Sequence, residues 1–453
     1  MTQGDTDLIT AVRADDAVQV RALLRAADEA ARGTVGAAAL GVDAPGANGL
    51  SALDIAAARG SYPVVEVLSG YGARLDRVGP DGRTPLLRAV DAGAYAVAVL
   101  LQSASVPLWP KGPDGRTALE LARHWHETGA ENELRRRTGA TESAESSEPS
   151  GPAEISRVMD DEYSFTRLLR LPGTDAHVRT GHTAILCRLE AVHGIRTPFA
   201  ELLARAEAEG DLRGVTRHAA VSVLYGRADP ETWEAAAALR THPRPSVRHF
   251  GAEVVRCISL FDECEEGGGC IDGAGCVAEP AAGLFLAWAA DEPDPDVLAV
   301  LLTALADCPA LPRATLAEAL LPHARHPSAV VRRSVANAFV ACADEEGVLP
   351  QILGYLQDGD AEVRRSSCFA VARQRDRSRE VRDCLIPLLA DPSIELQIQA
   401  VRALVLVDDP RGEEALDWLG PGYTEDEPGY WFLYEAHRHL RLRKEAGAPG
   451  GRS

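Results

Sequence analysis

Residues 81–89 read DGRTPLLRA, and this stretch decides the fold of the first third of the chain. The same pattern recurs 33 residues earlier, as NGLSALDIA at 48–56, and 33 residues later, as DGRTALELA at 114–122. The Asn-Gly or Asp-Gly pair is typical of a tight turn, and Thr84 and Pro85 are placed to cap and begin a helix. The recurrence predicts stacked helix pairs, because one unit alone could not bury both of its apolar faces.

The repeated segment resembles the ankyrin repeat, whose signature combines a D/N-G turn, T-P-L-H-x-A and a second helix carrying V-V-x-L-L. With a degenerate unit near the N-terminus, we expect about four such units in residues 5–138. Ankyrin arrays bind proteins, so the resemblance implies a binding role without naming the partner. The sequence departs from the family pattern where histidine normally stands, at Asp54, Leu87 and Glu120.

A second, looser period begins after residue 155. Each unit has a polar turn with Asp or Pro, then Val-Arg or an equivalent pair, then an apolar helix. All steps between units are 32 to 37 residues except one of 50, which suits two short helices and two turns of an α-solenoid. The recurrence is similar to the short bacterial HEAT repeat, in which the Val packs inward and the Arg reaches an Asp of a neighbouring turn. The markers are Val178, Val215, Val247, Val297, Val331, Val363 and Leu396.

The arginines that follow four of these markers form a column. We expect them to hold turns to helices, with an anion-binding groove as the alternative reading. These residues are Arg179, Arg248, Arg332 and Arg364.

The predicted fold is therefore all-α, with two α-solenoids, an ankyrin array followed by a HEAT-like array. Residues 139–154, rich in Glu, Ser, Gly and Pro, are expected to form a flexible linker that lets the arrays move. The HEAT-like array of about seven units is expected in residues 155–420, with an insertion near 258–280. Residues 421–453 are expected to form a C-terminal cap and disordered tail. Within them the aromatic run 430–434 caps the last repeat or, alternatively, binds peptide.

Charge and composition restrict the location and the partners. The formal net charge is −20, which disfavours nucleic acid as a partner because phosphates would be repelled. The N-terminus lacks a basic stretch followed by an apolar run, and no 18 uncharged apolar residues occur in succession, so a cytoplasmic protein without a membrane anchor is expected. Two Lys against 45 Arg indicate a GC-rich bacterial genome.

The insertion carries the spacing C-x6-C-x5-C-x5-C from Cys257 to Cys276. Structural zinc sites usually present closer C-x2-4-C pairs, so no metal residue is predicted. Whether Cys264, Cys270 and Cys276 bind a metal ion or form a disulfide stays open, and a plain loop is preferred to both.

Acidic residues dominate the same region. Eleven of them, and no Lys or Arg, lie from Cys257 to Pro312. A solvated loop is one explanation of this charge. The other, which is our hypothesis, is that the acidic residues attract and bind a basic protein partner. The predicted partner-binding residues are Asp262, Glu263, Glu265, Glu266, Asp291, Glu292, Asp294 and Asp296.

No catalytic or cofactor-binding residue and no cofactor are predicted. The sequence lacks the common nucleophile, phosphate-loop and metalloprotease motifs, and solenoids rarely enclose the dry pocket that catalysis needs. We expect an interaction module acting as adaptor, scaffold or inhibitory, immunity-like partner, and not an enzyme. The alternatives are a HEAT-fold enzyme or modification factor, similar to bilin lyases or DNA glycosylases, and a metal or redox sensor using the insertion cysteines.

Overall fold

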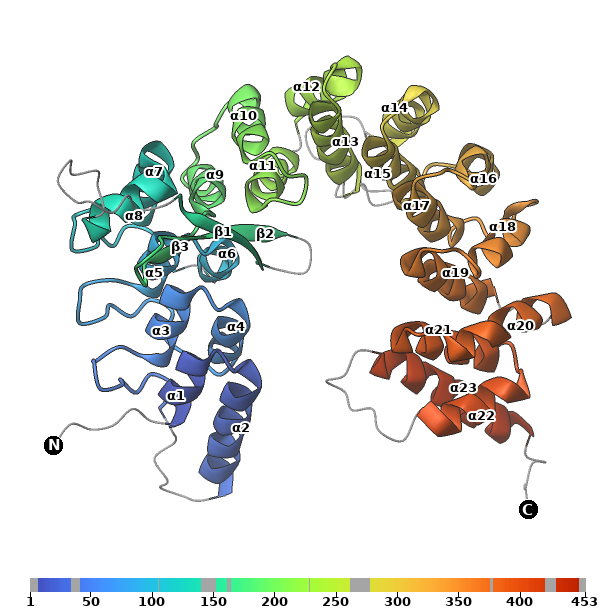
Figure 1. Cartoon of the computed structure of the whole chain (residues 1–453), viewed down its shortest axis with the longest axis horizontal. Helices are drawn as coiled ribbons and strands as arrows, with labels where there is room; N and C mark the ends of the chain where they lie inside the picture. Colours follow the sequence, from blue (N-terminus) through green and yellow to red (C-terminus); the bar gives the residue numbers. More distant parts are fainter. Residues whose placement is uncertain are drawn as a thin grey trace, which may run out of the picture. The chain divides into compact units, whose positions relative to one another are not determined.

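Helices make up most of the chain (Figure 1), and one small three-stranded sheet is present in its described part. The expected all-α solenoid fold is confirmed. The chain forms two compact units, Met1–Arg227 and Ala228–Ser453. None of the described helices combines the length and apolar composition needed to cross a bilayer. The computed structural model describes residues 7–33, 41–104, 106–139, 152–160, 164–227, 229–260, 278–374, 378–419 and 429–447.

The first unit begins with four helix pairs. The first helix of each pair contacts the first helix of the next, and the second helices α2, α4 and α6 also contact in turn. This is the stacking that the 33-residue period predicts. The eight helices are α1 (Asp7–Ala14), α2 (Ala17–Gly33), α3 (Ala52–Arg59), α4 (Tyr62–Gly70), α5 (Pro85–Asp91), α6 (Tyr95–Ser103), α7 (Ala118–Thr128) and α8 (Ala130–Thr138).

Hydroxyl caps begin the first helix of three pairs, as the sequence predicts. The side chains of Ser51, Thr84 and Thr117 each accept a hydrogen bond from the backbone N–H three residues later. Asp54 and Glu120 complete capping boxes by accepting from the N–H of the capping residue. Carboxylates therefore take over the cap at two positions where the family pattern has histidine.

A three-stranded antiparallel sheet follows in the order β1-β2-β3, with β1 (Glu154–Met159), β2 (Phe165–Arg170) and β3 (His177–Arg179). The prediction of a helical repeat at Val178 was wrong, because Val178 lies in β3 and pairs with Leu169. Three helices complete the unit, namely α9 (His182–Val192), α10 (Phe199–Glu209) and α11 (Val215–Tyr225).

The sheet is attached to the helix pairs by backbone hydrogen bonds. The N–H of Arg179 donates to Ala92 at 3.1 Å, and the N–H of Gly181 donates to Gly93 at 3.2 Å. Gly93 has a φ of 63°, and a Cβ there would lie 2.1 Å from the carbonyl oxygen of Arg179. Only glycine fits this contact.

Asp160, which follows β1, makes a second attachment. Its carboxylate accepts a hydrogen bond of 2.7 Å from the N–H of Ala96 in the first turn of α6. These contacts explain why the first compact unit extends to Arg227 and does not end at the predicted linker. Residues 140–151 of that linker lie outside the described part of the chain.

The second unit is a stack of helices in which α13, α15, α17, α19 and α21 contact one another in turn. The predicted markers Val247, Val297, Val331, Val363 and Leu396 lie in the first turns of these helices and are at most 1% exposed. The helices are α12 (Pro230–Ala238), α13 (Pro245–Leu260), α14 (Ala278–Asp291), α15 (Pro295–Ala306), α16 (Arg313–Leu320), α17 (Ala329–Phe339), α18 (Val348–Tyr355), α19 (Ala361–Gln374), α20 (Arg379–Leu385), α21 (Ile394–Leu406), α22 (Pro410–Leu419) and α23 (Tyr430–Gly447).

The arginine column forms the structural ladder that the sequence predicts in this unit. Nε and Nη2 of Arg332 donate to Asp358 at 2.8 and 2.9 Å, while Nη1 donates to the carbonyl oxygens of His326 and Pro327. Arg248 and Arg364 repeat the arrangement, with Glu292 and Asp391 as their acidic partners.

The aromatic run in α23 divides between the core and the surface. Leu433 and Ala436 are buried against α21 and α22, with Phe432 packed beside them. Trp431 is 65% exposed and Tyr434 is 45% exposed. The predicted capping is therefore performed by Phe432 and Leu433, whereas Trp431 points to solvent.

Candidate functional site

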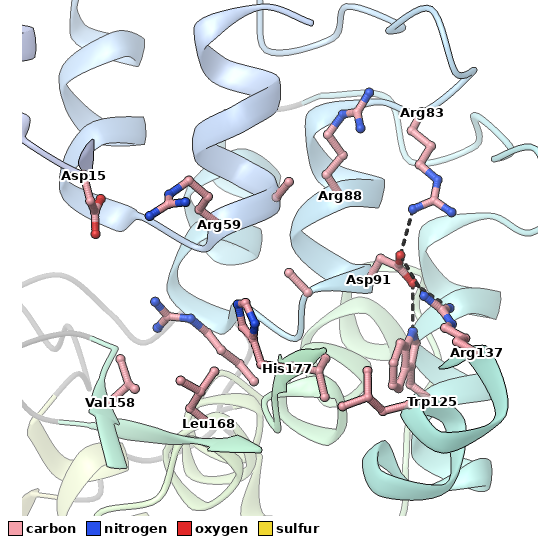
Figure 2. Close-up of a pocket in the computed structure, with 15 residues that line it drawn as sticks. Asp15, Arg59, Arg83, Arg88, Asp91, Trp125, Arg137, Val158, Leu168 and His177 are labelled. Atoms are coloured by element: carbon pink, nitrogen blue, oxygen red, sulfur yellow. Dashed lines mark hydrogen bonds and ion pairs between the residues drawn. The ribbon is translucent and has the colours of Figure 1, made fainter. Parts of the chain in front are cut away.

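The candidate site is a pocket of about 390 Å³ in the first unit, between the ends of α3, α5 and α7 and the small sheet. The 33-residue period brings equivalent positions together there, with Arg59, Ala92 and Trp125 at the ends of three successive first helices. Figure 2 shows charged side chains directed into this space from several elements. Asp15, Ala58, Arg83, Arg88, Asp91, Leu134, Arg137, Val158, Leu168, His177, Val178 and Arg179 complete the lining.

Asp91 is the centre of the hydrogen-bond network at one end of the pocket (Figure 2). It accepts from Nη1 of Arg83 at 2.7 Å and from Nε1 of Trp125 at 3.1 Å, and Nη2 of Arg137 lies 2.8 Å away. Burial alone would raise the pKa of Asp91, but Arg137 and Arg83 outweigh burial and hold the pKa below its usual value. Asp91 is therefore an ionised anchor for two arginines.

Trp125 fixes one of these arginines by stacking. The guanidinium of Arg137 lies 4.5 Å from the Trp125 ring centroid, and the His182 ring is stacked on Trp125 at 4.3 Å. Burial lowers the pKa of His182 to about 4, so its imidazole is neutral at pH 7. The stack connects α7, α8 and α9 beside the pocket.

Two further arginines of the pocket form ion pairs with carboxylates that do not line it. Arg88, only 7% exposed, donates to Asp54 at 3.0 Å and to Asp81 at 2.5 Å. Arg179 lies 3.6 Å from Asp160. These ion pairs set the positions of the guanidinium groups before any ligand arrives.

Arg59 and Asp15 differ from the other charged residues of the pocket. Both are exposed, and neither side chain forms a hydrogen bond or ion pair with another described residue. Figure 2 shows both on the side of the pocket away from Asp91. One unpaired cation and one unpaired anion are thus available to an incoming molecule.

The acidic residues predicted to bind a partner lie elsewhere, in the second unit. Glu292 is buried and accepts from Arg248 and from Nε1 of Trp288. Asp294 caps α15 by accepting from the N–H groups of Asp296 and Val297. These two carboxylates are therefore engaged in the fold, because isolated charges are costly to bury and helix N-termini need acceptors.

Asp291 and Asp296 are exposed and stay predicted partner-binding residues. The other predicted acids, Asp262, Glu263, Glu265 and Glu266, lie outside the described residues, as do Cys264, Cys270 and Cys276. Within the described chain, no three His, Cys, Asp or Glu residues gather as a metal ion would require.

Sequence reasoning missed the pocket because five of its fifteen lining residues lie in the unpredicted sheet. A signal was nevertheless present in the 33-residue alignment. One position near the end of each first helix carries Arg59, Ala92 and Trp125, and the position before it carries Ala58, Asp91 and His124, so large or charged residues stand where another unit has alanine. Polar variation at equivalent repeat positions indicates a binding face, since repeat arrays bind along such surfaces.

Among the comparisons with known proteins, the family model matches within the second unit. A model of HEAT repeats matches residues 349–430, which include α19, α20, α21 and α22. Protein YibA of Escherichia coli, from strain K12 and from O157:H7, is 29% identical over 81 residues, or 18% of this chain. This match spans 29% of the length of YibA.

Two solved structures are similar at lower identity. The X-ray structure of YibA is 17% identical, with a TM-score of 0.40, and the similarity covers 54% of this chain and 93% of that one. A crystal structure of an engineered protein is 16% identical, with a TM-score of 0.38, covering 96% and 99%. The chain thus contains HEAT repeats at residues 349–430, within a stack of helices.

Proposed function

We propose that this protein is a non-catalytic cytoplasmic scaffold that holds a protein partner in the pocket of its first unit. The observation that carries the proposal is the contrast between fixed and unpaired charges in the pocket. Arg83, Arg88 and Arg137 are held by ion pairs, whereas Arg59 and Asp15 face solvent without partners. Rigid, preoriented groups beside unpaired ones suit recognition, because less freedom is lost on binding.

The likeness of the first array to ankyrin repeats supports the same proposal. The period, the hydroxyl caps and the paired helices all follow that pattern, and ankyrin arrays bind proteins. We propose an ankyrin-like array in residues 5–138 and an adaptor role in which each unit offers one surface.

The charge of the second unit favours a basic partner segment there. Residues 228–453 contain 37 acidic residues against 22 Lys and Arg. Asp291 and Asp296 remain exposed at the turn between α14 and α15, so a basic segment would gain favourable long-range electrostatics. An inhibitory, immunity-like role is the form of the proposal in which this partner is a basic toxin.

Affinity capture from the native host with mass spectrometry tests the proposal. We would compare the unaltered chain with Arg59→Glu in the pocket and with Arg25→Glu on α2, where the side chain of Arg25 is 76% exposed. The proposal predicts one stoichiometric protein partner that Arg59→Glu releases and Arg25→Glu retains. A partner unaffected by Arg59→Glu, or none above background, would contradict it.

A further inference from the structure

We infer that the pocket of the first unit recognises a short acidic peptide segment, whose oxyanion binds Arg59. The inference rests on the proposed function, because it names the chemistry of the partner held in that pocket. The oxyanion is the carboxylate of Asp or Glu, or a phosphoryl group on a peptide side chain.

Charge at the pocket surface is the first argument. Five arginines line the pocket against two aspartates, although the whole chain carries a net charge of −20. Asp54, Asp81 and Asp160 offset part of this charge from outside the lining. The surface that a ligand meets still presents more guanidinium than carboxylate groups, which favours an anionic group. The lining arginines are Arg59, Arg83, Arg88, Arg137 and Arg179.

The distribution of ion pairs selects the contact residue. Arg83 pairs with Asp91, and Arg137 pairs with both Asp91 and Glu133. Arg88 pairs with Asp54 and Asp81. A guanidinium has five donors, of which a carboxylate uses two, so these paired arginines still present N–H groups. Arg59 keeps all of its donors and its full charge, and it is the residue on which a ligand oxyanion gains most.

Asp15 limits how acidic the ligand can be. Its side chain is exposed, unpaired in the described structure and lines the same pocket as Arg59. A second anionic group nearby would be repelled, whereas a peptide N–H or a basic side chain would be bound. The pocket therefore fits one acidic residue beside a donor, which describes a peptide better than a polyanion.

Nucleic acid fits these observations poorly. Residues 1–227 hold 30 acidic residues against 25 Lys and Arg, so the unit as a whole carries a net negative charge. Binding of a phosphate backbone needs several adjacent neutralising contacts along a strip. The pocket offers one unpaired arginine and one opposing aspartate.

Fluorescence polarisation with the purified full-length chain tests the inference. The probes are labelled short peptides with randomised flanks and a fixed central Glu, phosphoserine or Gln. We expect the Glu and phosphoserine pools to bind about tenfold or more tightly than the Gln pool, with an affinity that falls as salt rises. The stronger of the two acidic pools identifies the source of the oxyanion.

Two substitutions with opposite expected effects make the test specific. Arg59→Ala should weaken binding of the acidic pools about tenfold, and Asp15→Asn should strengthen it several-fold, since one attraction and one repulsion are removed. Asn tolerates the left-handed backbone of residue 15, whose φ is 61°. Arg25→Ala, which removes an equal charge from α2, should leave binding unchanged.

Equal binding of the Gln and acidic pools, or equal effects of Arg59→Ala and Arg25→Ala, would overturn the inference. Inorganic phosphate that binds as tightly as the phosphoserine pool would overturn the peptide assignment. If partner capture depends on Arg59 but the acidic and Gln pools bind equally, only the ligand class is wrong. If Arg59→Glu also leaves partner capture unchanged, the proposed function is wrong as well.

Discussion

Removal of Arg332 should open the second unit locally, because one side chain satisfies three acceptor groups. Its guanidinium binds Asp358 through two N–H groups and donates to the carbonyls of His326 and Pro327. The two charged side chains are 19% and 11% exposed. Arg332→Ala leaves a largely buried carboxylate unpaired, which we expect to cost about 2–4 kcal/mol.

Hydrogen exchange measured by mass spectrometry over residues 326–374 reports this opening directly. The expected cost corresponds to exchange of the protected amides of α17 and α19 that is about 30-fold or more faster. Arg332→Lys should give an intermediate exchange rate, because lysine keeps the positive charge but cannot make a bidentate contact with Asp358. The matched control is Arg365→Ala, whose ion pair with Glu362 is 47% and 40% exposed, with a cost below about 0.5 kcal/mol. Equal, small effects of Arg332→Ala and Arg365→Ala would refute the ladder as a source of stability.

Three further predictions concern the first unit and use thermal unfolding of the full-length chain. Asp160→Ala removes the acceptor for the N–H of Ala96 and should destabilise this unit by about 1–3 kcal/mol; an unchanged transition would contradict the attachment of the sheet. His182 has its pKa lowered to about 4, so its contribution to stability should fall as pH drops from about 6.5 towards 4, and His182→Phe, which keeps the stack, should lessen this loss. Hydrogen bonds from Arg136 lower the pKa of Glu133 to about 2, so its stabilisation is complete above its usual pKa near 4.5 and is lost as pH falls towards 2. Glu133→Gln should remove that acid-dependent part, and identical acid profiles would contradict it.

Much of the fold could be predicted because the sequence pattern of helical repeats recurs at a nearly constant spacing. Thr84 caps α5 as expected, and the valine markers from Val247 to Val363 are buried at helix starts. Both features depend on local residues and on the neighbouring unit, so a single recurring pattern is sufficient to locate them.

The sheet and the pocket depend on contacts that no period encodes. Gly93 and Arg179 are 86 residues apart in the sequence. They come into contact only because the chain folds so that the turn after α5 lies against β3. The hypothesis that acidic residues bind a basic partner loses support at Glu292 for a similar reason. Its partner Arg248 lies 44 residues away, outside the window in which the sequence shows only acids.

Site-specific photo-crosslinking with the captured partner tests the central claim most directly. A photoreactive residue would be placed at Ala58, which lines the pocket and is exposed, or at Val18 on α2, which is 80% exposed. The account predicts crosslinks to an acidic segment of the partner from position 58 and none from position 18. Crosslinks from position 18 alone, or none from position 58 while the partner remains bound, would contradict it.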